Sequence, residues 1–177
     1  KRPIGPFEQP LLAINPDPID KVHVTYQNGD VYEGGLNERK KREGHGSFIT
    51  ANRKKPNGYE YHGPWHDGGR QGSDGKCFFY NDSFYIGDWV NDMRHGRGEL
   101  FGKYSEERYV GEWDSDLRHG KGIVTAVGAI NSSGGGSHGG SGLHHYEGRF
   151  RDDRRHGRGI LKMTQNHHRM SFRQMEV

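Results

Sequence analysis

The chain has 177 residues, of which only 29% are hydrophobic, and its 29 glycines are about twice the average share. The formal net charge is +3, from 26 Lys and Arg against 23 Asp and Glu, so bulk charge gives no reason to expect nucleic-acid binding. One cysteine excludes an internal disulfide and fits a reducing, cytoplasmic setting, and no apolar stretch is long enough to cross a bilayer as a helix.

The N-terminal segment is predicted to lead into the folded region. Residues 1–21 contain five prolines and are expected to form an extended arm. Apolar and polar residues then alternate from Val22 to Tyr32 around an Asn28-Gly29 dipeptide. That pattern is typical of two strands joined by a tight hairpin turn.

One sequence pattern then recurs five times. In its clearest copy, Tyr85-Ile86-Gly87-Asp88-Trp89 is followed by Arg94-His95-Gly96-Arg97-Gly98, and the same frame returns 24 residues later from Tyr109. The copies start near residues 32, 61, 85, 109 and 146, with a Gly/Ser-rich insertion at 131–142. We therefore expect a repeat array over 22–163 and a tail or partial repeat over 164–177.

The first two copies are less regular than the others. The second has Pro64 after its central glycine, Gln71 in place of His and a displaced Gly75. The first has a longer charged loop before Gly44-His45-Gly46. These departures leave open whether the second copy keeps the geometry of a regular hairpin.

The spacing within each copy predicts β-hairpins. Alternate side chains of a strand share one face, so Tyr85, Gly87 and Trp89 are expected to point the same way. A glycine between two large rings leaves bare backbone, over which a ring from a neighbouring hairpin can lie. The predicted fold class is all-β, an elongated single-layer antiparallel sheet of stacked β-hairpin repeats, each burying its aromatic face only against its neighbours.

The Tyr-x-Gly-x-Trp and His-Gly-x-Gly modules at Tyr85–Gly98 and Tyr109–Gly122 resemble MORN (membrane occupation and recognition nexus) repeats, and looser copies extend the resemblance over about 32–163. The resemblance implies an elongated, gently curved sheet with a binding or scaffolding role. Such arrays occur in radial spoke heads of cilia, in cytoskeletal scaffolds, in junctional membrane proteins and beside the catalytic domains of some enzymes. In those enzymes the repeats are not the catalyst.

The favoured function is a non-enzymatic scaffold that binds other proteins of a multi-subunit assembly. The resemblance favours a cytoskeletal or ciliary setting, such as a flagellar axoneme with radial spokes. The predicted contact surface consists of the repeat rings, which alternatively only pack on one another; they are Tyr61, Trp65, Tyr85, Trp89, Tyr109, Trp113, Tyr146 and Phe150.

Two alternatives remain open from the sequence. The first is a membrane-surface module that binds anionic phosphoinositides, and the second is an accessory module of a larger enzyme. The candidate anion-binding residues, which are also compatible with solvated loops, are Arg39, Lys40, Lys41, Arg42, Arg53, Lys54, Lys55, Arg149, Arg151, Arg154 and Arg155.

Catalytic and metal sites are not predicted. His45, His95, His119 and His156 recur as turn residues of the repeat, which favours a structural role over a unique site. His138, the pair His144-His145 and the pair His167-His168 lack a Cys, Asp or Glu at a known ligand spacing. Cys77, in an apolar run, is expected to pack as a small side chain. We therefore expect no catalytic residues, metal or cofactor.

Overall fold

The computed structural model describes residues 21–127, 129–130, 136–137, 142–165 and 169–176. Within this part of the chain all regular structure is β, and no helix is long and apolar enough to cross a membrane. In chain order the strands are β1 Val22–Thr25, β2 Val31–Leu36, β3 Arg42–Ile49, β4 Tyr59–His66, β5 Gly69–Arg70, β6 Gly72–Phe79, β7 Phe84–Val90, β8 Met93–Gly102, β9 Glu107–Asp114, β10 Leu117–Val127, β11 Ala129–Ile130, β12 Gly136–Ser137, β13 Gly142–Arg151, β14 Arg154–Gln165 and β15 Arg169–Glu176.

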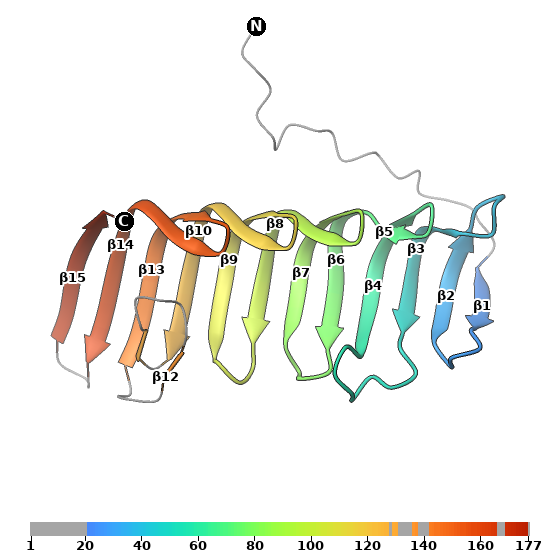
Figure 1. Cartoon of the computed structure of the whole chain (residues 1–177), viewed down its shortest axis with the longest axis horizontal. Coiled ribbons are helices and arrows are strands. Elements are labelled where there is room, and N and C mark those ends of the chain that lie inside the picture. Colours follow the sequence, from blue (N-terminus) through green and yellow to red (C-terminus); the bar gives the residue numbers. More distant parts are fainter. Residues whose placement is uncertain (1–20, 128, 131–135, 138–141, 166–168, 177) are drawn as a thin grey trace, which may run out of the picture.

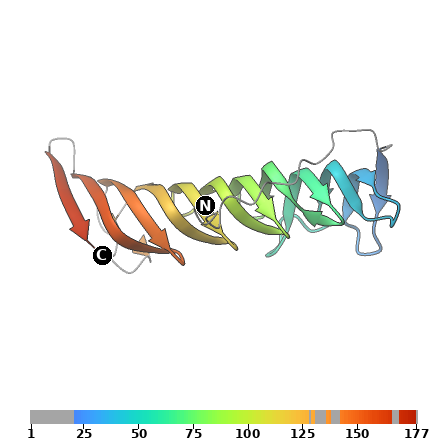
Figure 2. The same ribbon diagram turned by 90° about the horizontal axis from the view of Figure 1, so that it is seen from above.

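The strands form one long antiparallel meander (Figure 1). The main sheet has 13 strands in the order β1-β2-β3-β4-β6-β7-β8-β9-β10-β13-β14-β15, and β5 pairs with β4 beside this path. The short strands β11 and β12 form a separate two-stranded sheet, and β10 pairs directly with β13 in the main sheet. Seen from above, the sheet is a narrow, twisted ribbon (Figure 2). The predicted single-layer antiparallel fold is confirmed.

Several predicted segments can be compared with the strands. The N-terminal hairpin is present as β1 and β2, and Gly29 in its turn takes a φ of 85°. The predicted arm at 1–21 lies outside the described residues except for Lys21, and so does most of the insertion at 131–142. Residues 169–176, in the predicted tail or partial repeat, form β15, which pairs with β14.

A row of glycines crosses the sheet where each hairpin bends. Gly87 faces Gly98 across one pair of strands, and Gly98 faces Gly111 across the next. Directly after Gly87 the register shifts, so that Asp88 pairs with His95 and Gly96 and Arg97 are extra. Such a bulge bends its strand and increases the local twist. Gly96 has a φ of 56°, which a glycine adopts without steric cost.

The hairpin turns are tight. Val90 pairs with Met93, so only Asn91 and Asp92, residue types that favour turns, lie between the strands. Both turn residues have positive φ, 49° and 65°, as a two-residue type I′ turn requires. The paired residues beyond the bulge form a short hairpin tip.

The second copy keeps regular geometry despite its unusual sequence. Its Gly75 still faces Gly87 across the sheet. The Pro64 carbonyl accepts a hydrogen bond from the Tyr61 hydroxyl at 3.0 Å, as the Asp88 carbonyl does from Tyr85. The displaced glycine is accommodated by a register shift between Gly72 and Gly75. The extra residue therefore changes the tip of this hairpin and leaves its packing on the neighbours intact.

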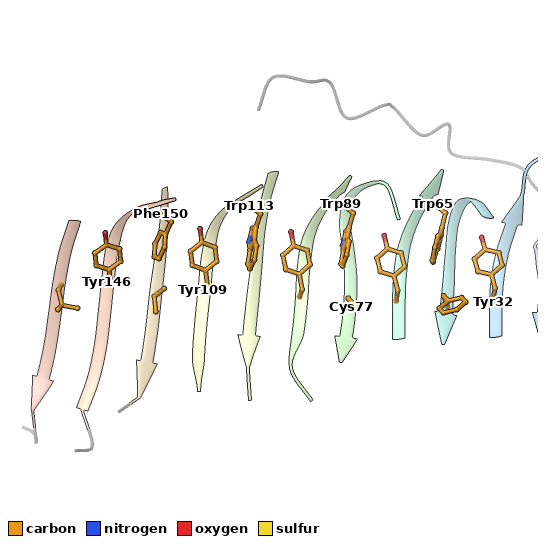
Figure 3. Close-up of a cluster of buried hydrophobic side chains, with 13 residues drawn as sticks. Tyr32, Trp65, Cys77, Trp89, Tyr109, Trp113, Tyr146 and Phe150 are labelled. Atoms are coloured by element: carbon orange, nitrogen blue, oxygen red, sulfur yellow. The ribbon is translucent and has the colours of Figure 1, made fainter. Parts of the chain in front are cut away.

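The core is a line of alternating tyrosines and tryptophans on one face of the sheet (Figure 3). The Tyr85 ring lies edge-on between Trp89 of its own strand, at 5.2 Å between centroids, and Trp113 of the next repeat, at 5.4 Å. The same contact recurs from Tyr32 to Tyr146, and edge-to-face packing is the arrangement that aromatic pairs prefer. We call this side of the sheet the ring face.

Candidate binding groove

The predicted contact rings are not exposed. All eight are at most 3% exposed, as Tyr85 at 0% and Trp113 at 1% illustrate. The expectation of an exposed aromatic contact surface is therefore corrected, and the alternative, in which the rings pack on one another, describes the structure. Figure 3 shows the labelled rings in one row across successive strands.

The burial of the rings follows from their hydrogen bonds and from the glycines beneath them. The Tyr85 hydroxyl donates to the Asp88 carbonyl at 3.0 Å, and Trp89 Nε1 donates to the Gly75 carbonyl at 3.2 Å. A Cβ atom placed on Gly87 or Gly98 would collide with the Tyr85 ring or hydroxyl. Because every polar atom of these rings has a partner, burying them leaves no unsatisfied donor.

An arginine from each hairpin tip covers the rings from outside. The Arg94 guanidinium lies 4.4 Å from the Trp113 ring centroid, and Arg70 lies 4.1 Å from Trp89. Arg94 Nε also donates to Asp116 Oδ1 at 2.9 Å, in the tip of the next hairpin. The Arg70–Asp92 and Arg118–Asp153 pairs repeat this arrangement. The tips are thus joined to each other as well as to the sheet.

The opposite face of the sheet carries a groove of about 840 Å³. The row of glycines, among them Gly87, Gly98 and Gly111, forms its floor. Its other lining residues alternate along the strands with the ring-face residues, so Ile86 and Asp88 point away from Tyr85. We call this side the groove face.

An apolar row borders the groove on one side. Its apolar residues are Ile86, Val110, Ile123 and Ile160, from β7, β9, β10 and β14. Glu99 pairs with both Ile86 and Val110, and Glu147 with both Ile123 and Ile160, so a glutamate interrupts the row on β8 and on β13. Val110 is 40% exposed, Ile123 36% and Ile160 45%. The row is therefore open to a partner along the groove.

A charged row borders the groove on the other side. From β6 to β14 it consists of Asp74, Asp88, Arg97, Glu112, Lys121, Arg149 and Arg158. Partial burial raises the pKa of Asp88, and the negative charge of Asp74 raises it further. The backbone N–H of Arg97 donates to Asp88 Oδ2 at 2.8 Å and favours its charged form. The apolar and charged rows give the groove two chemically different sides.

Aromatic residues extend the apolar surface of the groove face beyond Ile86. Phe84 stacks on Phe101 at 5.4 Å between centroids, and Phe78, which is 41% exposed, lies 6.4 Å from Phe84. A smaller hollow of about 420 Å³ beside them is lined by Phe78, Phe79 and Tyr80 together with both acids and bases.

The candidate anion-binding residues do not form one site. Arg42 covers Trp65 at 4.1 Å, and Arg155 covers Tyr146 at 4.7 Å. Lys41 Nζ is 2.6 Å from Asp67 Oδ2, and Arg53 pairs with Glu60. The structure therefore gives these four side chains protein partners. The other candidates are exposed and lie on separate loops, tips and strands: Arg39, Lys40, Lys54, Lys55, Arg149, Arg151 and Arg154.

The repeat histidines and Cys77 lie in surroundings that fit a structural role. The backbone carbonyls of His95 and His119 lie 3.5 and 3.4 Å from the hydroxyls of Tyr85 and Tyr109. Cys77 is 0% exposed, and burial raises the pKa of its thiol to about 11. Within the described residues, no group of three or more His, Cys, Asp or Glu could hold a metal ion. These residues give no sign of an activated nucleophile.

The groove was not predicted from the sequence, because the repeated rings are its strongest pattern. A signal was present in the sequence: Ile86 and Val110 directly follow the repeat tyrosine, and Ile123 directly follows the final glycine of His-Gly-x-Gly. Alternation places these aliphatic residues on the face opposite the rings. Alternation alone does not show which of the two faces the hairpin tips cover.

Comparison with known proteins agrees with this architecture. A family model of the MORN repeat matches residues 85–104, 109–126 and 146–165. A comparison with curated proteins gives no match. The three matched segments correspond to the hairpins β7–β8, β9–β10 and β13–β14, whose strands form most of the groove.

Proposed function

We propose that this chain, a member of the MORN-repeat family, is a non-enzymatic scaffold that holds a segment of a partner protein in the groove on the face opposite its rings. MORN repeats are in general modules that bind proteins or lipids. The observation that carries the protein-binding proposal is the apolar row, in which Val110, Ile123 and Ile160 are 36–45% exposed next to a hollow of about 840 Å³. Grooves of this size with an apolar side and fixed polar groups are typical of binding sites.

The ring face is a poor alternative for the contact surface. Its largest side chains are buried and hydrogen-bonded, and arginines such as Arg94 already occupy the space over them. A partner on that face would have to displace the joined hairpin tips. The groove face requires no such rearrangement, because its lining is already open.

A setting in a larger assembly is part of the proposal. We propose the cytoskeleton or a ciliary axoneme, as in radial-spoke-like assemblies, and this setting is supported by the family resemblance alone. Localising the tagged protein in ciliated cells tests it separately from the groove. Signal outside both the axoneme and the cytoskeleton would reject the setting and leave the groove proposal intact.

The binding proposal is tested with a groove variant and a matched surface variant. Val110→Asp with Ile123→Asp places two carboxylates in the apolar row, whereas Leu117→Asp changes a residue that is 39% exposed on a hairpin tip. Affinity purification from the native source, with cross-linking, should recover the same proteins with the parent and the Leu117 variant, and lose them with the groove variant. Equal recovery by all three folded proteins would reject the proposal.

The phosphoinositide alternative has a clear outcome in a flotation experiment. Binding to vesicles that contain phosphatidylinositol bisphosphate, abolished by high salt and unchanged by the groove variant, would favour a membrane-surface module. The proposal predicts no flotation of the parent protein at physiological ionic strength.

A further inference from the structure

We infer that the groove accepts an amphipathic helix of a partner protein in a single direction, with an acidic end over Lys121 and Arg149 and a basic end over Asp74 and Asp88. This inference rests on the proposed function and specifies the partner's chemistry. It comes from the order of charges along the groove, which differs between its two ends.

The end of the groove near β10 and β13 is basic. Lys121 and Arg149 are register partners on these two strands, so two cations face each other directly. Like charges opposite each other on neighbouring strands destabilise a sheet. Within residues 21–127 and 143–163, neither the Lys121 nor the Arg149 side chain forms an ion pair. An acidic group from a partner would therefore be favourable beside Lys121 and Arg149.

The opposite end, at β6 and β7, is acidic. Asp74 and Asp88 both line the groove, and the pKa of Asp88 is raised by its burial and by the neighbouring Asp74. The negative charge of Asp74 thus disfavours the ionisation of Asp88 in the free protein. A cationic side chain of the partner would relieve this repulsion.

The middle of the groove is close to neutral. Arg97 and Glu112 are register partners with opposite charges. Next to them Val110 and Ile123, which are also register partners, present the most central part of the apolar row. A segment in this groove would meet apolar side chains along its length and opposite charges at its two ends.

The direction of the groove favours a helix over an extended segment. The groove runs across β6, β7, β8, β9, β10, β13 and β14, and the backbone groups of its floor are already paired within the sheet. An extended segment would find few backbone partners there, whereas a helix satisfies its own hydrogen bonds. Seven strands spaced about 4.8 Å apart cover roughly 29 Å, the length of a helix of about 19 residues.

A protein helix fits this charge order better than a membrane does. An anionic lipid surface would be attracted to Lys121 and Arg149 but repelled by Asp74 and Asp88 in the same groove. Glu147, which lines the groove on the same strand as Arg149, would add to the repulsion. Only a ligand with both signs of charge complements the whole groove.

The first experiment selects partners by sequence. A display library of natural 24-residue peptides is selected on the parent protein, and binders that persist on the Val110→Asp, Ile123→Asp variant are discarded. The inference predicts enrichment of amphipathic peptides with acidic residues at one end and basic residues at the other. A selection that yields no peptides, or peptides without this charge order, would overturn it.

The second experiment measures one selected peptide by fluorescence anisotropy. Lys121→Glu with Arg149→Glu should weaken binding at least tenfold, and changing the acidic end of the peptide to Lys should restore it. Arg154→Glu, an exposed cation on a hairpin tip, serves as the control and should leave binding unchanged. A nitroxide on the acidic end should broaden the methyl signal of Ile160 and spare that of Ile86, which lie at opposite ends of the apolar row.

The outcomes separate this inference from the proposed function. Peptides that bind the charge-reversed variant normally but fail on the groove variant would overturn the direction and keep the groove as a protein-binding site. Selection of the same peptides by the parent and the groove variant would overturn both. Phosphoinositide vesicles that bind the parent but not the charge-reversed variant, without any charge order among the peptides, would replace the helix with a membrane surface.

Discussion

The Arg94 guanidinium lies 4.4 Å from the Trp113 ring centroid, so an arginine of one repeat covers the tryptophan of the next. The same side chain donates to Asp116 through Nε and Nη2, at 2.9 and 2.7 Å, and the Asp116 N–H donates to the Arg94 carbonyl at 3.0 Å. Successive hairpins are thus joined at their tips by both cation–π and charge-assisted contacts.

The Arg94–Asp116 pair is expected to contribute measurable coupling between repeats. Its Arg is only 21% exposed, so solvent weakens the interaction less than for a fully exposed pair. A double-mutant cycle with Arg94→Met and Asp116→Ala, followed by urea denaturation, should give a coupling free energy of about 1 kcal/mol. The exposed pair Lys103–Asp82 is the control and should give none above error. Equal results for both pairs would contradict the role of the tips.

Gly98→Ala should destabilise the array. A Cβ atom there would collide with the Tyr85 ring, which the surrounding rings hold in place. Overpacking of this kind typically costs about 1–3 kcal/mol. Gly69→Ala is the control, because its new methyl group would come no closer than 3.2 Å to the exposed Asp92 side chain. Chemical denaturation that shows the same stability for both variants would refute the close packing of Tyr85.

Trp89→Ala should destabilise several hairpins at once. The Trp89 ring contacts Tyr61 and Tyr85 in two repeats, and its loss also leaves the Gly75 carbonyl without its indole donor. Removing a buried aromatic side chain typically costs about 3–5 kcal/mol. Hydrogen exchange should show faster exchange on both neighbouring hairpins. Tyr104→Ala, at a side chain that is 83% exposed, should leave exchange and melting unchanged.

The repeats explain how much of this fold could be predicted from sequence. Tyr85, Gly87 and Trp89 recur at alternate positions, so the hairpins and the contact of rings with glycines follow from strand periodicity. Which face of the sheet is covered could not be predicted from the sequence, because the bulge after Gly87 and the positive φ of Gly96 bend the hairpin tip over the rings. In the sequence Arg94 is one basic residue among many, and only the bent tip brings it over Trp113.

Asp88 and Glu99 should change stability with pH in opposite directions. The folded-state pKa of Asp88 is raised, chiefly by burial, so its ionisation costs stability as pH rises above the ordinary carboxyl range. Asp88→Asn should therefore stabilise the protein at pH 7 and have no such effect near pH 3. The pKa of Glu99 is lowered by its hydrogen bond with Arg108, so Glu99→Gln should destabilise at pH 7 and lose this effect as pH falls through the lowered pKa. Thermal melts across pH check both signs, and parallel profiles would contradict them.

Cys77 should report the opening of the sheet. Its side chain is fully buried, and the rise of its pKa from 9.0 to about 11 lowers the thiolate fraction about a hundredfold near neutral pH. Labelling by a maleimide should be slow in the native protein and fast in urea. In Trp89→Ala the native rate should rise, because the hairpins around Cys77 open more often. Rapid labelling of the native parent protein would contradict the packing of β6.

The most direct test of the central claim is a methyl NMR footprint of a bound partner segment. Ile86, Ile123 and Ile160 have methyl groups in the groove, whereas Val124 and Leu161 have theirs among the buried rings. Titration with the partner should shift the three isoleucine signals strongly and leave the signals of Val124 and Leu161 near their free positions. Large shifts confined to Val124 and Leu161, with the isoleucine signals unmoved, would show that the partner binds the ring face and would contradict the account.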